Sequence, residues 1–208
     1  MATTAHDEPR ILEHLREARS ILDVGCGKGR FLQAAGPERT WGIDISGASI
    51  AECAKKGLRA LACDAARIGD PEVRARILAW AGVERFDAVH ISHVIEYFAP
   101  DQAYDILIGA RELLAPRGIL VVKAPLESPT FWDTFGHVRP YTEVAIEGIL
   151  CGVPGAQLER PTLGFERIEV LFLWGGLAGR LASLGLPVPW RWKRASARSF
   201  AFIARKRA

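Results

Sequence analysis

Short apolar runs of strand length alternate with segments of helical period along most of this 208-residue chain. The apolar runs cover residues 21–25, 41–45, 58–64, 86–92 and 118–124, and the helical segments cover residues 30–36, 46–57, 70–82 and 99–116. Such alternation predicts an α/β fold with a parallel sheet, because parallel strands need a crossover between them. Ligands bind such sheets at the carboxyl ends of the strands, so the residues that follow each strand are the candidates for function.

The pattern loosens after residue 124. Residues 125–142 form a predicted loop rich in proline and aromatic residues, and residues 142–152 a predicted helix capped by Thr142. Residues 165–175 and 198–206 are two predicted late strands. The length and an apolar fraction of 49% predict one domain over 1–208. Its parts are a core over about 10–125, a segment over about 125–164, and the late strands with a basic insert over 165–208.

The cysteines and the N-terminus indicate the cellular compartment in which the protein works. Cys26, Cys53, Cys63 and Cys151 form no CxxC pair and no spacing typical of a metal site. We therefore expect reduced thiols and no metal. The first ten residues lack the pattern of a signal peptide, so we expect a cytoplasmic protein.

Three glycines, Gly25, Gly27 and Gly29, stand at alternate positions directly after the first predicted strand. Glycine lets backbone pass close to a ligand, and the next helix offers free N–H groups. The dinucleotide pattern G-x-G-x-x-G needs a third glycine at position 30, where this chain has Arg30. The turn therefore indicates a nucleotide, although a tight strand–helix turn without a ligand would also use glycine.

Two aspartates follow the next two predicted strands. Asp44 lies 19 residues after Gly25, where a carboxylate can accept both hydrogen bonds of a ribose diol. Asp64 can accept the exocyclic amine of adenine, with Cys63 and Ala65 lining the ring. The alternatives are a helix-capping role for Asp44 and a turn role for Asp64.

The order and spacing of five segments resemble the class I S-adenosylmethionine-dependent methyltransferases. The segments are "ILDVGCGKGRFL", "WGIDIS", "LACDA", "FDAVHISHVIEYF" and "LLAPRGILVVKAP". The resemblance implies a Rossmann-like, mostly parallel sheet of seven strands, with helices on both faces and the last strand antiparallel. It implies S-adenosylmethionine as cofactor, with the glycine turn at the methionine part, Asp44 at the ribose and Asp64 at adenine. The implied cofactor-binding residues are Asp23, Gly25, Cys26, Gly27, Gly29, Asp44, Ile45, Cys63, Asp64, Ala65 and Ser92.

The segment after the fourth predicted strand gives information about the molecule that accepts the methyl group. Family members that methylate nitrogen of bases or of glutamine carry an Asn/Asp-Pro-Pro-aromatic motif there, which this chain lacks. Its "HVIEYF" is similar to runs in small-molecule and glycan-type members. His93 would lie at the methyl-donor end and can act as a general base on a hydroxyl. Alternatively, His93 packs against the cofactor or caps the next segment.

The loop over 131–142 is the predicted acceptor-side segment. His137, Arg139 and Tyr141 alternate, so in an extended stretch they face one side. They offer a base, a fork for carboxylate or phosphate, and an aromatic wall, with Trp132 nearby. We predict His137 as a second catalytic candidate and Arg139, Tyr141 and Trp132 as substrate-binding residues. An ordered loop that is salt-bridged to the body is the alternative.

Eight of the 27 basic residues follow Glu169, whereas all 24 acidic residues lie at or before it. This asymmetry indicates an anionic partner such as a membrane surface or RNA, unless the tail is simply solvated. The stretch "LPVPWRWKR" over 186–194 suits a peripheral membrane contact or a surface insert. The sequence therefore predicts a methyltransferase for a small-molecule or glycan/lipid-linked acceptor, most simply at oxygen. The alternatives are an RNA methyltransferase and a non-catalytic cofactor-binding partner protein, with an NAD oxidoreductase more distant.

Overall fold

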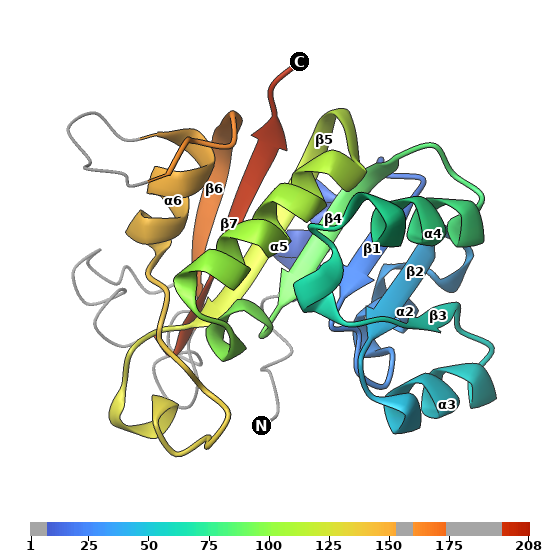
Figure 1. Cartoon of the computed structure of the whole chain (residues 1–208), viewed down its shortest axis with the longest axis horizontal. Coiled ribbons are helices and arrows are strands. Elements are labelled where there is room, and N and C mark those ends of the chain that lie inside the picture. The colour runs from blue at the N-terminus through green and yellow to red at the C-terminus, as the bar shows by residue number, and fades with distance from the viewer. Residues whose placement is uncertain (1–7, 153–159, 174–196) are drawn as a thin grey trace.

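A seven-stranded sheet of order β3-β2-β1-β4-β5-β7-β6 forms the centre of the protein (Figure 1). The computed structural model describes residues 8–152, 160–173 and 197–208. The strands are β1 (Ile21–Val24), β2 (Thr40–Asp44), β3 (Ala60–Ala62), β4 (Phe86–Ser92), β5 (Leu114–Pro125), β6 (Phe165–Leu173) and β7 (Ser199–Lys206). Strand β7 runs antiparallel to its neighbours β5 and β6, and the strand pairs from β3 to β5 are parallel. The predicted fold class, including the antiparallel last strand, is confirmed.

Helices cover both faces of the sheet. The α-helices are α1 (Glu8–His14), α2 (Arg30–Ala35), α3 (Gly47–Lys55), α4 (Pro71–Ala81), α5 (Pro100–Leu113) and α6 (Glu143–Cys151). Short 3-10 helices cover η1 (Pro37–Arg39), η2 (Ala65–Arg67), η3 (Ile95–Tyr97) and η4 (Pro129–Phe131). Helices α4, α5 and α6 pack on one face, in front of the sheet in Figure 1, and α1 and α2 pack on the other. No helix in the described ranges is long and apolar enough to cross a membrane.

Local sequence signals account for several helix boundaries. Ser46 and Thr142 accept hydrogen bonds from backbone N–H groups three residues on and so cap α3 and α6. Asp70 caps α4, Pro71 occupies its first turn, and Gly82 ends it in the left-handed conformation. The observed boundaries of α3, α4 and α6 are therefore close to the predicted ones.

Three elements differ from the predicted ones. The sequence pattern does not reveal α1, which has only seven residues and one buried position, Ile11. Strand β3 is shorter than predicted, because the N–H of Leu58 bonds the Cys53 carbonyl and closes the end of α3 instead. Strand β5 begins at Leu114, four residues earlier than predicted. The predictions for residues 174–175 and for the insert at 186–194 lie outside the described residues.

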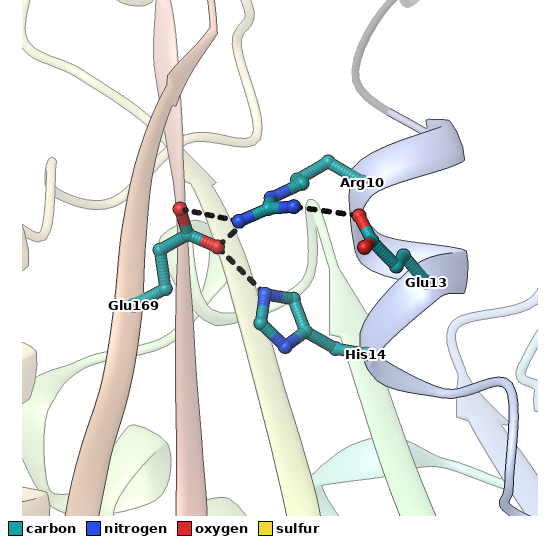
Figure 2. Close-up of polar contacts among 4 residues, drawn as sticks. All are labelled: Arg10, Glu13, His14 and Glu169. Carbon is teal, nitrogen blue, oxygen red and sulfur yellow. Dashed lines mark hydrogen bonds and ion pairs between the residues drawn. The ribbon is translucent and has the colours of Figure 1, made fainter.

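Helix α1 contacts β6, an edge strand of the sheet, through the side chain of Glu169 (Figure 2). The Glu169 carboxylate accepts from Arg10 Nε at 3.2 Å and lies 2.6 Å from His14 Nε2, and Arg10 also pairs with Glu13. Burial raises the pKa of Glu169, but the hydrogen bonds from His14 and Arg10 outweigh it, so the pKa lies below its ordinary value. We call these four residues the α1–β6 clamp.

Candidate cofactor and acceptor site

The glycine turn between β1 and α2 lies at the carboxyl edge of the sheet. Gly25, Gly27 and Gly29 all have left-handed backbone, with φ of 75°, 51° and 77°. A Cβ on Gly25 would lie 2.3 Å from Val94 Cγ2, and a Cβ on Gly29 would lie 2.4 Å from Leu58 Cδ1. A Cβ on Gly27 would meet no atom within 4 Å. The outer glycines therefore allow close packing within the protein, whereas Gly27 exposes backbone to open space where a ligand can approach.

Asp44 joins the glycine turn to the beginning of α3. Its Oδ2 accepts from the Gly27 N–H at 2.8 Å and its Oδ1 accepts from the Ser46 N–H at 2.8 Å. Each carboxylate oxygen has a second lone pair, so these contacts leave room for the hydroxyls of a ribose. The residue thus combines the local structural role of a turn acid with a position suited to a sugar diol.

Cys63 and Asp64, two of the three residues predicted for adenine, line a cavity of about 230 Å³ beyond Asp44. Ile45, Cys63 and Asp64 line it together with Ala62, Arg67, Val73 and Arg76. Ile45 is 73% exposed, which is unusual for an isoleucine. A flat apolar ring bound in this cavity would cover its side chain. The Asp64 side chain accepts from the Ala66 N–H and caps η2, which contains Ala65. These residues fit a purine ring with a carboxylate at its edge.

A second cavity, of about 130 Å³, lies beside the glycine turn on the face covered by α1 and α2. We call it the floor cavity, and its lining residues are Glu8, Ile11, Asp23, Gly25, Cys26, Arg30, Phe31, His90, Ser92 and Lys123. Four of them, Asp23, Gly25, Cys26 and Ser92, are predicted cofactor residues. Sequence reasoning missed His90 and Lys123. The signal that could have found them is that each is a polar residue at an inward-facing position of a strand that is otherwise apolar.

Asp23 and His90 form a buried pair in the floor cavity. His90 Nδ1 lies 2.7 Å from Asp23 Oδ1, and the His90 ring stacks on Phe31 with centroids 3.8 Å apart. Burial raises the pKa of Asp23, although the hydrogen bond from His90 opposes the shift. Burial also raises the pKa of the Cys26 thiol, so this group stays protonated and is a poor nucleophile.

His93 follows β4 in a conformation that is rare for a residue with a side chain. Its φ is 55°, and its N–H donates to the Lys123 carbonyl at 2.9 Å. His93 Nδ1 lies 3.3 Å from Glu96 Oε1, and the Glu96 side chain is buried without a hydrogen bond in the described structure. Such backbone strain often accompanies functional positions. The imidazole is partly exposed, so it can still meet a ligand.

The predicted acceptor segment packs against this turn. The Glu96 carbonyl accepts from the Val138 N–H at 2.8 Å, and the His137 ring lies edge-on to Tyr97 with centroids 5.0 Å apart. His137 Nδ1 lies 2.8 Å from the Phe131 carbonyl, which leaves Nε2 for another partner. The structure therefore brings the segments of the two candidate bases, His93 and His137, together.

The predicted substrate residues have different environments. The Arg139 guanidinium lies 5.2 Å from the centre of the Tyr141 ring, so these two share a side as the alternation predicts. Tyr141 is buried and its hydroxyl donates to the Phe98 carbonyl, so much of its ring supports the loop rather than a pocket wall. Trp132 is 55% exposed. Within the described ranges, no three His, Cys, Asp or Glu side chains are grouped to hold a metal ion.

Comparisons with known proteins agree with this geometry. Residues 22–120 match the family model described as "Methyltransferase domain". No curated protein matches the chain by sequence. Many solved structures share the fold, and three of them illustrate the similarity. A SAM-dependent methyltransferase from Archaeoglobus fulgidus has a TM-score of 0.66 and 22% identity, over 96% of this chain and 94% of that one.

The second is the N-methyltransferase NodS from Bradyrhizobium japonicum in complex with S-adenosylhomocysteine, with a TM-score of 0.64, 18% identity and coverage of 96% and 85%. The third is 1,6-didemethyltoxoflavin-N1-methyltransferase from Burkholderia thailandensis, with a TM-score of 0.62, 18% identity and coverage of 98% and 78%. Residues 22–120 therefore match a methyltransferase domain, and the chain has the fold of the class I S-adenosylmethionine-dependent methyltransferases.

Proposed function

We propose that the protein methylates an oxygen atom of a small-molecule or glycan/lipid-linked acceptor. The observation that carries the proposal is the row of Gly27, Asp44 and Asp64 along the carboxyl edge, with a cavity at each end of the row. The acceptor would lie between the turn at 93–97 and the segment at 131–141. These two segments adjoin each other through the Glu96 carbonyl.

The residues along this edge fit S-adenosylmethionine. The glycine turn would hold the methionine part, the Asp44 carboxylate the ribose, and Ile45, Cys63 and Asp64 the adenine. The bound cofactor supplies a methyl group on a positively charged sulfur. The protein must then align the acceptor atom with that methyl and exclude water, and such positioning accounts for roughly 7–11 kcal/mol in favourable cases.

A hydroxyl acceptor must lose a proton as it is methylated, and two histidines suit that task. His93 Nδ1 lies 3.3 Å from Glu96 Oε1, and the Nε2 atom of His137 is not used in its contact with the Phe131 carbonyl. The Asn/Asp-Pro-Pro-aromatic motif of base and glutamine N-methyltransferases is absent after β4. Two of the structural neighbours are named N-methyltransferases, and one of them has 1,6-didemethyltoxoflavin bound, which supports a small acceptor.

The first experiment is calorimetric titration with S-adenosylhomocysteine and, separately, with NADH. We expect the first ligand to bind and the second not to bind. The second experiment is transfer of a tritiated methyl group from S-adenosylmethionine to lipid, sugar and RNA fractions of the host. Label in a lipid or sugar fraction supports the proposal, and label in RNA alone contradicts it.

The His137→Ala variant separates catalysis from cofactor binding. Because His137 lies in the acceptor segment, we expect at least a tenfold loss of methyl transfer with unchanged affinity for S-adenosylhomocysteine. His14→Ala is the matched control, since His14 lies in the α1–β6 clamp. Equal methyl transfer by His137→Ala and wild type would remove His137 from the mechanism.

A further inference from the structure

A cavity of about 560 Å³ lies at the amino edge of the sheet, the edge opposite to the glycine turn. We call it the amino-edge cavity. It is bordered by α1, by the residues just before β1, by the beginnings of β4 and β5, and by the end of the antiparallel strand β7. Five arginines, three acidic residues and one histidine supply its charged lining. Because ligands of parallel sheets bind at the carboxyl edge, this cavity is separate from the proposed methyl-transfer site.

Some of these charged groups already have partners within the protein. Arg10 and Glu13 pair with each other in the α1–β6 clamp, to which the lining histidine also belongs. Arg16 lies 3.5 Å from Glu17. The carboxylate of Asp87 accepts two backbone N–H groups just before β1, at 2.8 and 3.1 Å. The three acidic residues of the lining are therefore engaged, two of them with arginines and one with backbone.

The other three arginines of the lining are Arg19, Arg117 and Arg205. Within residues 8–152, 160–173 and 197–208, their guanidinium groups make no ion pair and no hydrogen bond. They come from separate strands, since Arg19 precedes β1, Arg117 lies in the first part of β5, and Arg205 of β7 pairs with Ile119 of β5. Arginine is permanently charged, so the cavity has an excess of positive charge.

The backbone at Arg117 is strained. Its φ is 61°, in the left-handed region that a residue with a side chain rarely adopts. Glycine would adopt this conformation without strain, yet the glycine of this turn stands one position later, at Gly118, where φ is not positive. An arginine that occupies a strained position without an internal partner indicates a function for its side chain, because such strain is often found at functional sites.

The chemistry of the lining favours a diphosphate group as ligand. A guanidinium group binds phosphate oxygens in pairs, so three guanidinium groups suit about six oxygens, the number of terminal oxygens in inorganic pyrophosphate. The volume of the cavity is that of a small-molecule site, which is concave where a membrane is flat. Its described lining includes no phenylalanine, tyrosine or tryptophan on which the bases of RNA could stack.

We infer that the amino-edge cavity binds a small ligand through a diphosphate group, which Arg19, Arg117 and Arg205 hold by charge-assisted hydrogen bonds. This site goes beyond the proposed methyl transfer and does not depend on it. His93 follows the carboxyl end of β4, whereas the cavity lies at the beginning of the same strand. The protein therefore has two small-molecule sites, one at each edge of its sheet.

The first test compares three probes on wild type by calorimetric titration, at fixed ionic strength and without divalent cations. The probes are inorganic pyrophosphate, inorganic phosphate and a single-stranded RNA oligonucleotide. We expect pyrophosphate to bind at least tenfold more tightly than phosphate, because only the diphosphate engages all three arginines. Equal binding of the two anions, or binding of the RNA without binding of pyrophosphate, would overturn the inference.

The second test removes Arg117 without loss of stability. Arg117→Gly relieves the backbone strain, so we expect it to unfold at the same urea concentration as wild type or at a higher one. We expect it to bind pyrophosphate at least tenfold more weakly and S-adenosylhomocysteine as wild type does. Arg205→Gln should show the same loss of pyrophosphate binding, with no change of backbone preference at a strained position.

Arg160→Gln is the matched control, because it removes the same charge elsewhere. Arg160 pairs with Asp101 in the first turn of α5, which follows the carboxyl end of β4. It should bind pyrophosphate as wild type does. An equal loss in Arg160→Gln and Arg117→Gly would show that only net charge attracts the anion and would overturn the site. Failure of wild type to bind pyrophosphate would also overturn it, and would leave the proposed methyl transfer untouched.

Discussion

At the scale of single residues, Asp44 has the most consequences for function. It anchors the Gly27 N–H and the Ser46 N–H, and it is the proposed ribose ligand. We expect Asp44→Ala to weaken binding of S-adenosylhomocysteine by at least tenfold in calorimetric titration, because both the ribose contact and the turn anchor are lost.

Asp70→Ala is a close control for Asp44→Ala. Asp70 also accepts a backbone N–H two residues on, from Glu72, but it caps α4 away from the glycine turn. It should leave the affinity for S-adenosylhomocysteine unchanged. Binding by Asp44→Ala at the wild-type level would show that the ribose is held elsewhere.

The location of a residue at the carboxyl edge of the sheet could be predicted from the sequence where spacing along the chain carries the information. Asp44 ends β2, and Gly27 and Asp64 come shortly after β1 and β3, so the parallel sheet brings them to one edge. His90 and Lys123 could not be assigned in the same way. They lie on different strands, and only the pairing of β1, β4 and β5 in the folded sheet brings them to one cavity.

At the scale of secondary-structure elements, the α1–β6 clamp predicts a pH-dependent stability. The lowered pKa of Glu169 means that its ionised form stabilises the folded state. This stabilisation is present above the ordinary pKa of 4.5 and is lost as the pH falls through the lower folded-state value. We expect Glu169→Gln to reduce the free energy of unfolding by about 1 kcal/mol at pH 7. The difference from wild type should shrink below pH 4.5, as measured by urea unfolding at several pH values.

Glu52→Gln provides the comparison for Glu169→Gln. Glu52 pairs with Lys55 at 2.6 Å on the exposed surface of α3, so its loss should change stability little at any pH. A difference between Glu169→Gln and wild type that persists unchanged at acid pH would contradict the clamp.

The clamp also shows why α1 escaped prediction. Its seven residues offer one buried side chain, Ile11, which is too little for a periodic pattern. Its position depends on Glu169, 155 residues after His14, and no local signal encodes that contact. By contrast, α4 was predicted well because its capping residues Asp70 and Gly82 are local.

At the scale of the whole molecule, one topological property unites the fold and the site. Strands β1 to β5 are parallel, so the turns that follow them meet at one edge of the sheet. This property was predictable, because the strand–helix alternation requires it. The position of the predicted acceptor segment was harder to predict, since residues 131–142 contain no regular element beyond the end of η4. Their position is set by tertiary contacts such as that between Val138 and Glu96.

The same topology predicts where a bound cofactor protects the backbone from hydrogen exchange. Amides that exchange through local opening are slowed only where the ligand holds the opening closed. With S-adenosylhomocysteine, we expect slower exchange in peptides that contain residues 25–30, 44–47, 63–67 and 92–97, measured by mass spectrometry. Residues 115–118 lie in β5 at the end opposite to the site, and they should exchange at the same rate with and without ligand. Protection of residues 115–118, with none at the glycine turn, would place the cofactor at the wrong edge of the sheet for transfer near His93.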